Sequence, residues 1–183
     1  MNNIKKIEKA RTNIFIKDSF LGYILQHIKI NIVEKGTTAY TDGKEIYFTE
    51  DFLESLDLEA TIFVLMHELL HIVLKHVNRI KNKNRLVYNI ATDYIINEML
   101  IRAGYKSGNL KNILFSNKAR YNHSAEQVYS EIINDYHDEF KSFSDHSKWE
   151  ATNSDFIDEI IDRAIEKGYE TSLSGLRSQI LIN

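Results

Sequence analysis

Two histidines and a glutamate stand inside a long apolar stretch of the chain, at the spacing of metal ligands. The stretch is FVLMHELLHIVLKH, from Phe63 to His76, and it contains His67, Glu68 and His71 in the pattern H-E-x-x-H. Residues four apart on a helix lie on one face, so both imidazoles can bind one zinc ion with bonds of about 2.0–2.1 Å. Glu68 would face the open side of the metal and accept a proton from a water molecule that the metal acidifies. The pattern supplies two ligands and a base, and it requires a third ligand from another element.

The helix that carries this motif also allows a second interpretation, in which the polar side chains only pack. Apolar residues fill almost every other position, which predicts a helix from about Leu58 to about Ile80 that is buried on all sides. Histidines in such a core helix can be satisfied by hydrogen bonds to backbone carbonyl groups. Two histidines and a glutamate at this spacing favour the metal site over that alternative.

His76 is predicted not to bind the same metal. It follows His71 by five residues, which is about 140° around a continuous helix. We therefore expect a role at the C-terminal end of the helix, or a hydrogen bond to a neighbouring helix.

The third metal ligand is predicted in the stretch NIATDYIINEML. Asp93 and Asn97 are four residues apart, and both fall within an otherwise apolar helical stripe where packing would favour valine or leucine. Glu98 falls on another face, where it can pair with Arg102. We expect Asp93 to be the third ligand and Asn97 to support a ligand or contact the substrate. The alternative is an aspartate that orients a ligand histidine without binding the metal.

A further candidate, His146, lies in the polar stretch FSDHSKWEA. It stands beside Asp145 and precedes Trp149, the only tryptophan of the chain. A histidine here could polarise a carbonyl oxygen or stabilise an oxyanion during hydrolysis, or even bind the metal. The alternative is a solvated loop histidine with no role in the site.

The surrounding pattern predicts helices around a small antiparallel sheet. Apolar spacing and turn residues predict one or two helices within 3–27, strands at Ile28–Val33, Thr38–Thr41 and Lys44–Phe48, and further helices at about 50–56, 58–80, 85–104, 124–140, 154–168 and 172–182. There is no internal repeat, linker or compositional break. We therefore expect one domain over residues 1–183.

Composition excludes several functional classes. The chain has 183 residues, of which 43% are hydrophobic and 27% charged, and its net charge of -3 provides no basic field for nucleic acid or for a membrane surface. It contains no cysteine, which excludes zinc ribbons and thiolate chemistry, so a metal must be held by histidine or oxygen ligands. Charged residues interrupt the apolar runs of the N-terminal region, so we expect neither a signal peptide nor a membrane span, and a cytoplasmic location.

These stretches together resemble a known family of proposed metallopeptidase domains, which commonly precede a von Willebrand factor A-like domain in bacterial and phage proteins. The similar segments are AYTDGKEIYFTEDFLESL, MHELLHIVLKHVNR, NIATDYIINEML, HSAEQVYSEI and SDHSKWE, and they span about residues 40 to 149. The resemblance implies an α+β, zincin-like fold, mostly helical, with a small antiparallel or mixed sheet packed over the motif helix. It implies one Zn²⁺ ion, with His67, Glu68, His71 and Asp93 as site residues, and it gives more weight to His146.

The resemblance also implies a function and a substrate groove. We expect a zinc metallopeptidase that acts on a peptide or protein substrate with Glu68 as the general base. In zincins the edge strand binds extended peptide, which would place Ile46, Tyr47 and Phe48 in the groove through main-chain pairing. The alternative is a zinc-stabilised module that binds a peptide, or a regulatory protein partner, with little or no proteolysis. Iron or manganese would also suit two histidines and a carboxylate.

Overall fold

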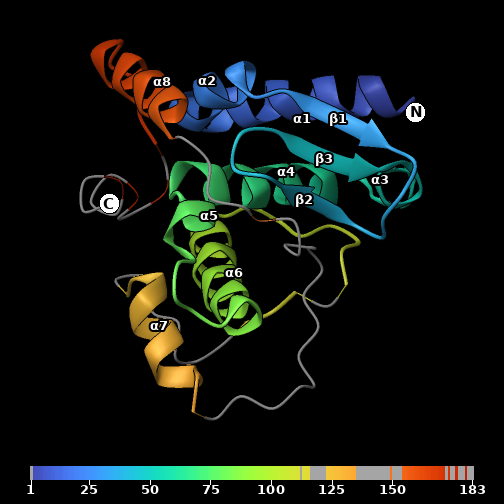
Figure 1. Cartoon of the computed structure of the whole chain (residues 1–183). Coiled ribbons are helices and arrows are strands. Elements are labelled where there is room, and N and C mark those ends of the chain that lie inside the picture. The colour runs from blue at the N-terminus through green and yellow to red at the C-terminus, as the bar shows by residue number, and fades with distance from the viewer. Residues whose placement is uncertain are drawn as a thin grey trace.

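Helices make up most of the residues that the structure describes, and a three-stranded sheet is embedded among them (Figure 1). The computed structural model describes residues 2–111, 113–115, 123–134, 149, 154–171, 173, 176 and 180. In chain order the elements are α1 (Asn3–Lys17), α2 (Ser19–His27), β1 (Ile30–Val33), β2 (Ala39–Thr41), β3 (Ile46–Thr49), α3 (Glu50–Ser55), α4 (Leu58–Val73), α5 (His76–Arg79), α6 (Arg85–Arg102), α7 (Ala125–Ile132) and α8 (Asp155–Glu166). The fold is α+β and mostly helical, as the sequence predicts.

The sheet is mixed, with the strand order β1-β3-β2. β1 runs parallel to β3, with Ile30 opposite Ile46, whereas β2 runs antiparallel to β3, with Ala39 opposite Phe48. The alternating pattern predicts an antiparallel sheet, and β1 departs from it by pairing in parallel, whereas the mixed sheet that the resemblance allows is confirmed. The reason is topological: β2 and β3 form a hairpin, and β3 pairs with β1 on its other side. The two edges of the sheet are consequently β1 and β2.

The hairpin between β2 and β3 follows the predicted Asp-Gly turn. The Asp42 carboxylate accepts hydrogen bonds from the backbone N–H groups of Lys44 and Glu45, at 2.9 and 2.8 Å. Gly43 has a φ of 91°, a backbone conformation that a side chain would disfavour. These bonds fix the register that places β3 in the middle of the sheet.

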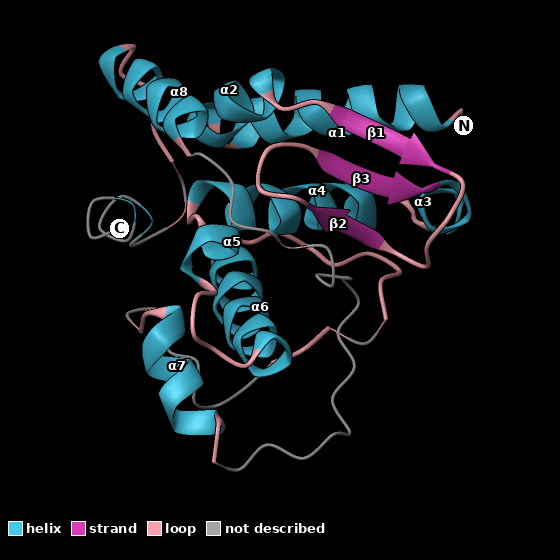
Figure 2. Ribbon diagram, viewed as in Figure 1, coloured by secondary structure: helices cyan, strands magenta, loops and turns pink. Residues whose placement is uncertain are grey.

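The motif helix α4 is the centre of the molecule (Figure 2). It contacts α1, α6 and α8 as well as β2 and β3. Its N-terminus is capped by Asp57, whose side chain accepts a hydrogen bond from the backbone N–H of Ala60 at 2.8 Å. Because neighbours surround it, almost every residue from Ala60 to Val73 is buried. The predicted all-round burial of this helix is confirmed, and polar side chains on it are enclosed.

The predicted continuous helix to Ile80 is wrong, because the chain turns at Lys75. α4 ends at Val73, Lys75 adopts a left-handed conformation with φ 53° and ψ 34°, and the short helix α5 begins at His76. No glycine, asparagine or proline marks this corner in the sequence. The change of direction moves His76 out of the position that helical phase assigns to it.

α6 packs against α4 and presents the second half of the site. Asn84 caps its start by accepting a hydrogen bond from the backbone N–H of Val87 at 3.2 Å. Gly104, with a φ of 73°, follows its last turn, as predicted. α7 packs along α6, and its N-terminus is closed by a capping box in which Ser124 and Gln127 bond to each other's backbone. The two helices form one end of the molecule, with α1, α2 and α8 at the other (Figure 1).

The outer helices are fastened by polar contacts and carry mixed charge. The Lys6 ammonium of α1 is buried, and it donates to the backbone oxygens of Leu53 and Leu56 at 2.7 Å each.

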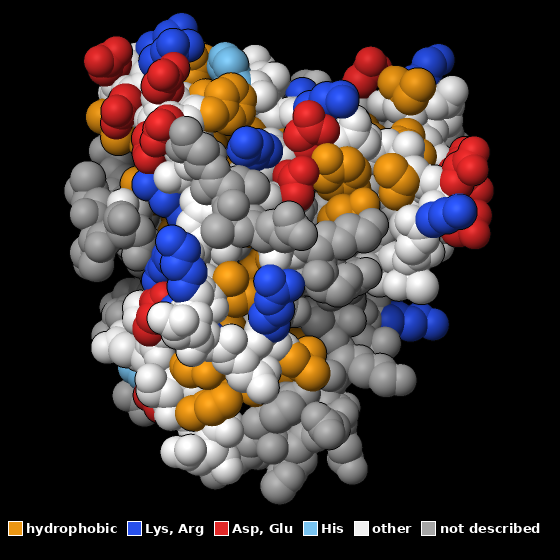
Figure 3. Space-filling view, in the orientation of Figure 1, with side chains coloured by type: hydrophobic (Ala, Val, Ile, Leu, Met, Phe, Trp, Pro, Cys, Tyr) orange, Lys and Arg blue, Asp and Glu red, His pale blue; other side chains and the backbone are white. Residues whose placement is uncertain are grey.

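Acidic and basic side chains are interspersed on the face that Figure 3 shows. Among the helices that the structure describes, none combines the length and the apolar character needed to cross a bilayer.

Candidate metal centre

Three side chains from two helices converge on one point in the core. The Nε2 atoms of His67 and His71, both on α4, lie 3.0 Å apart. The Asp93 Oδ1 atom of α6 lies 3.4 Å from the first and 3.3 Å from the second. These three residues form a group that could hold a metal ion, and all three side chains are fully buried. The i, i+4 spacing on α4 and the packing of α6 thus bring together the ligands that the sequence predicts.

The distances fit a small cation. Tetrahedral zinc with bonds of about 2.0–2.1 Å separates neighbouring ligand atoms by about 3.3–3.4 Å. The separations observed between the three donor atoms are 3.0, 3.3 and 3.4 Å. Two imidazole nitrogens and a carboxylate oxygen are also a donor set of catalytic zinc sites, in which three protein ligands leave the fourth position open.

Asn97 fixes which nitrogen of His67 faces the cluster. The Asn97 Nδ2 group donates to the backbone oxygen of Leu114 at 2.8 Å, so its Oδ1 atom is the one that faces His67 Nδ1 at 3.0 Å. An oxygen acceptor requires an N–H at His67 Nδ1. A neutral His67 therefore carries its lone pair on Nε2, toward His71 and Asp93, as a metal ligand requires. Asn97 thus holds the candidate ligand His67 in the tautomer that metal binding requires.

Glu68 is a buried carboxyl group with no compensating cation among the described residues. Its side chain is fully buried, and neither carboxylate oxygen has a hydrogen-bond partner among the residues that the structure describes. Burial first, and the negative charge of Asp93 second, raise the pKa of Glu68 well above its ordinary value. Two carboxyl groups and two imidazole lone pairs in one apolar pocket are unfavourable without a positive charge. A divalent cation would supply that charge, so the residues present fit a metal.

Two aromatic side chains that the sequence analysis did not place in the site lie against His71. The His76 ring is buried, with its Nδ1 atom 3.1 Å from His71 Nδ1, and it packs edge-on to Tyr88. Trp149 is also buried, with its ring centre 5.1 Å from that of His71. His76 stands outside the candidate ligand group, as expected, but it lies against His71 itself because the continuous helix that the sequence predicts is broken at Lys75. One feature of the sequence could have indicated that Trp149 belongs to the site: it is the only tryptophan of the chain, and it lies three residues after His146.

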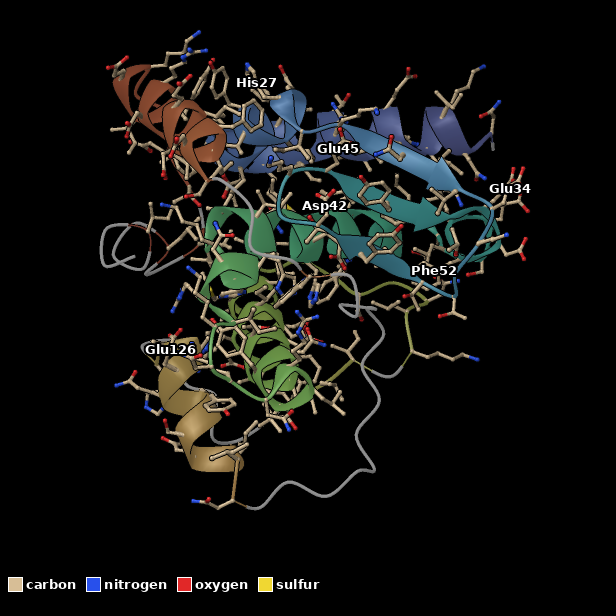
Figure 4. The ribbon with its side chains drawn as sticks, in the orientation of Figure 1. His27, Glu34, Asp42, Glu45, Phe52 and Glu126 are labelled. Carbon is tan, nitrogen blue, oxygen red and sulfur yellow. The ribbon has the colours of Figure 1, made fainter. Side chains whose placement is uncertain are left out.

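The predicted peptide groove on β3 is a second correction. β3 is the central strand and pairs with both neighbours, so its main chain cannot add a peptide strand. Ile46 and Phe48 are fully buried beneath the sheet. The Tyr47 hydroxyl donates to Asp42 at 3.0 Å, and its ring stacks on Tyr40 (Figure 4 labels Asp42). Main-chain pairing with a substrate would need an edge strand, β1 or β2.

Two other predictions concern residues near the site. Glu98 forms the expected ion pair with Arg102 on the outer face of α6, away from the buried cluster. His146 lies outside the residues that the structure describes, so its role stays a prediction.

Fold and site together define a class of protein: an α+β chain whose central helix and a neighbouring helix enclose a cluster of two histidines and an aspartate that could hold a metal. The chain belongs to the family described as "Putative metallopeptidase domain", whose match covers residues 2–172. Neither a curated protein nor a solved structure gives a significant match to the chain.

Proposed function

We propose that this protein is a zinc-dependent peptidase that hydrolyses a peptide bond in a peptide or protein substrate. The observation that carries the proposal is Glu68, a fully buried carboxyl group that has no hydrogen-bond partner in the described part of the chain and that accompanies three convergent donor atoms. A site that only stabilised the fold would gain nothing from this group, because an unpaired buried carboxyl destabilises the protein. Membership of a metallopeptidase family supports the same reading.

Each residue has a defined task in this proposal. His67, His71 and Asp93 would hold the cation, and Asn97 keeps His67 in the tautomer that binds it. A divalent cation supplies Lewis acidity, which polarises the substrate carbonyl and lowers the pKa of a water molecule. Glu68 takes the proton as the water attacks the carbonyl carbon, and it then gives the proton to the leaving amine. A general base works best with a pKa near the working pH, and burial raises the pKa of Glu68 in that direction.

A second candidate function has one observation in its favour, the complete enclosure of the site. His67, Glu68, His71 and Asp93 all have no exposed surface. A closed site of this kind also suits a module that uses zinc for stability and binds a peptide or regulatory protein elsewhere. The two functions differ in whether Glu68 is needed for turnover.

The substitution Glu68→Gln separates the two functions. It should preserve one zinc per chain by elemental analysis and reduce cleavage of a peptide library by at least about 100-fold, the usual contribution of a general base. Glu98→Gln is the matched control, because Glu98 pairs with Arg102 on the outer face of α6, and it should change neither quantity.

Two results would contradict the proposal. Purified protein that takes up no zinc would remove the metal site altogether. A zinc-loaded wild type that cleaves no peptide in the library, yet binds a partner, would favour the binding module.

A further inference from the structure

His71 contacts the rest of the protein through both edges of its ring. Its Nε2 atom faces His67 and Asp93, at 3.0 and 3.3 Å. Its Nδ1 atom, on the other edge, lies 3.1 Å from Nδ1 of His76. His76 therefore stands outside the predicted ligand set, behind the ligand.

The protonation of this pair follows from the chemistry of imidazole. A histidine that binds a metal through Nε2 carries its hydrogen on Nδ1 when neutral. His76 Nδ1 lies within hydrogen-bond distance of that N–H, and to accept the hydrogen it carries its own hydrogen on Nε2. The contact resembles the one between Asn97 and His67, in which an outer group also receives the Nδ1 hydrogen of a ligand.

The corner at Lys75 is the structural device that brings His76 to this position. On a continuous helix, residues 71 and 76 would point about 140° apart. A lysine with a φ of 53° ends α4 and redirects the chain, although side chains disfavour this conformation. The corner is held from α8 by the ion pair between Lys75 and Asp158, at 2.7 Å. Backbone strain at a residue adjacent to His76 indicates that the placement of its ring matters.

We infer that His76 is a positioning residue of the metal centre, which accepts the Nδ1 hydrogen of His71 and so keeps the Nε2 lone pair of His71 turned toward Asp93 and His67. This inference rests on the metal ligands of the proposed function, but it does not depend on hydrolysis. Outer partners of ligand histidines commonly change metal affinity by about 10- to 100-fold when they are removed. In this site the outer partner is an imidazole that packs edge-on against Tyr88. Many metal sites use a carboxylate or a backbone carbonyl in the same role.

The test compares two substitutions of His76 in the whole chain. His76→Phe keeps an aromatic ring of similar size and removes the acceptor, so we expect the zinc affinity, measured by competition with a chromophoric chelator, to fall by about 10- to 100-fold. His76→Asn keeps an acceptor near the position of Nδ1, and it should stay within about 3-fold of the wild type, well below that loss. The absorption bands of bound Co²⁺, which report ligand number and geometry, should change in the first variant and match the wild type in the second. Thermal unfolding of both metal-free variants checks that they fold.

The same two changes at His27 are the matched control. His27 is exposed on α2, with its Nδ1 atom 2.9 Å from the backbone oxygen of Tyr23, and neither change should alter zinc affinity. If His76→Phe fails to fold, His76→Met tests the same loss of the acceptor. Unchanged zinc affinity and cobalt bands in the Phe or Met variant would overturn the inference, as would equal losses in the Phe and Asn variants.

The outcome for His76 is distinguishable from the outcome for the proposed function. Zinc binding that responds to His76, without any peptide cleavage, would contradict the peptidase and support the inference. Full cleavage with unchanged affinity in His76→Phe would support the peptidase and contradict the inference. A wild type that binds no zinc would overturn both.

Discussion

Two clusters of polar side chains, one fully buried and one partly exposed, differ in how their charges are compensated. In the candidate metal centre, Glu68 has no hydrogen-bond partner among the described residues. In the second cluster, where α5, α6 and α7 meet, Glu126 accepts hydrogen bonds from Arg79 Nε and from the Tyr88 hydroxyl, each at 3.1 Å (Figure 4 labels Glu126). Lys83 adds a further positive charge 3.7 Å from the same carboxylate.

The pKa values of the two glutamates move in opposite directions for this reason. Burial raises the pKa of Glu68 and the negative charge of Asp93 raises it further, with no opposing cation among the described residues. Burial alone would also raise the pKa of Glu126, but the hydrogen bond and charge of Arg79 outweigh it and lower that pKa below its ordinary value. A cluster completed within the chain stabilises the fold. A cluster that lacks its counter-charge indicates a ligand that brings one.

The largest expected effect comes from supplying the missing charge. Zinc at about 1,000 times its dissociation constant should raise the free energy of unfolding of the metal-free protein by about 4 kcal/mol. Asp93→Ala removes a ligand and should abolish most of that gain, whereas Glu98→Ala on the outer face should keep it. Urea unfolding with and without zinc measures both. Equal losses in the two variants would contradict the assignment of Asp93 as a ligand.

The next effect compares the two glutamates directly in the metal-free protein. Glu68→Met replaces an unpaired buried carboxyl group by an apolar side chain of similar shape, and it should raise the free energy of unfolding by about 1–3 kcal/mol. Glu126→Met removes the carboxylate that pairs with Arg79, so it should lower the free energy of unfolding. The decrease should be no more than about 1 kcal/mol, because the ion pair is partly exposed. Urea unfolding at neutral pH measures the change in the free energy of unfolding for each variant, and with it the sign of each change. Changes of the same sign would remove the distinction between the clusters.

The same pair of variants has a pH signature. The raised pKa of Glu68 destabilises the metal-free protein only above the ordinary pKa of a glutamate, so the gain from Glu68→Met should grow as the pH rises from acid to neutral. The lowered pKa of Glu126 stabilises the protein above that ordinary pKa, and the contribution is lost as the pH falls through the lowered value. The deficit of Glu126→Met should therefore disappear at acid pH. Parallel pH profiles for the two variants would contradict these opposite directions.

Local patterns in the sequence predicted the parts of this molecule that depend on local rules. The H-E-x-x-H spacing placed His67 and His71 on one face, and two polar residues in an apolar stripe located Asp93 and Asn97 on the facing helix. The Asp-Gly turn and the glycine after α6 could also be predicted, because Gly43 and Gly104 each occupy a position with positive φ that favours glycine. The α+β class followed from the same short-range patterns.

The predictions that were wrong concern features that depend on tertiary context. β1 pairs in parallel with β3 because the hairpin is inserted beside it, and short alternating stretches do not encode the order of strands. That order turned the predicted edge strand, with Ile46 and Phe48, into the buried centre of the sheet. His76 was misplaced because a lysine took up the left-handed conformation, which propensity assigns to glycine or asparagine. The corner is supported by Asp158, which is 83 residues away from Lys75 in the sequence.

Lys75 joins the two clusters, and it gives the smallest and most local prediction. It lies between α4, which carries His71, and α5, which carries Arg79 and which it caps. Glycine adopts its φ of 53° without the steric cost that a side chain meets, so Lys75→Gly should be more stable than Lys75→Ala by about 1 kcal/mol. Both variants lose the ion pair with Asp158, which makes them a matched pair. Lys75→Gly should also keep the zinc affinity of the wild type, because the corner that directs His76 toward His71 is preserved. Chemical denaturation and zinc competition test the two statements separately, and an alanine variant as stable as the glycine variant would show that the corner carries no strain.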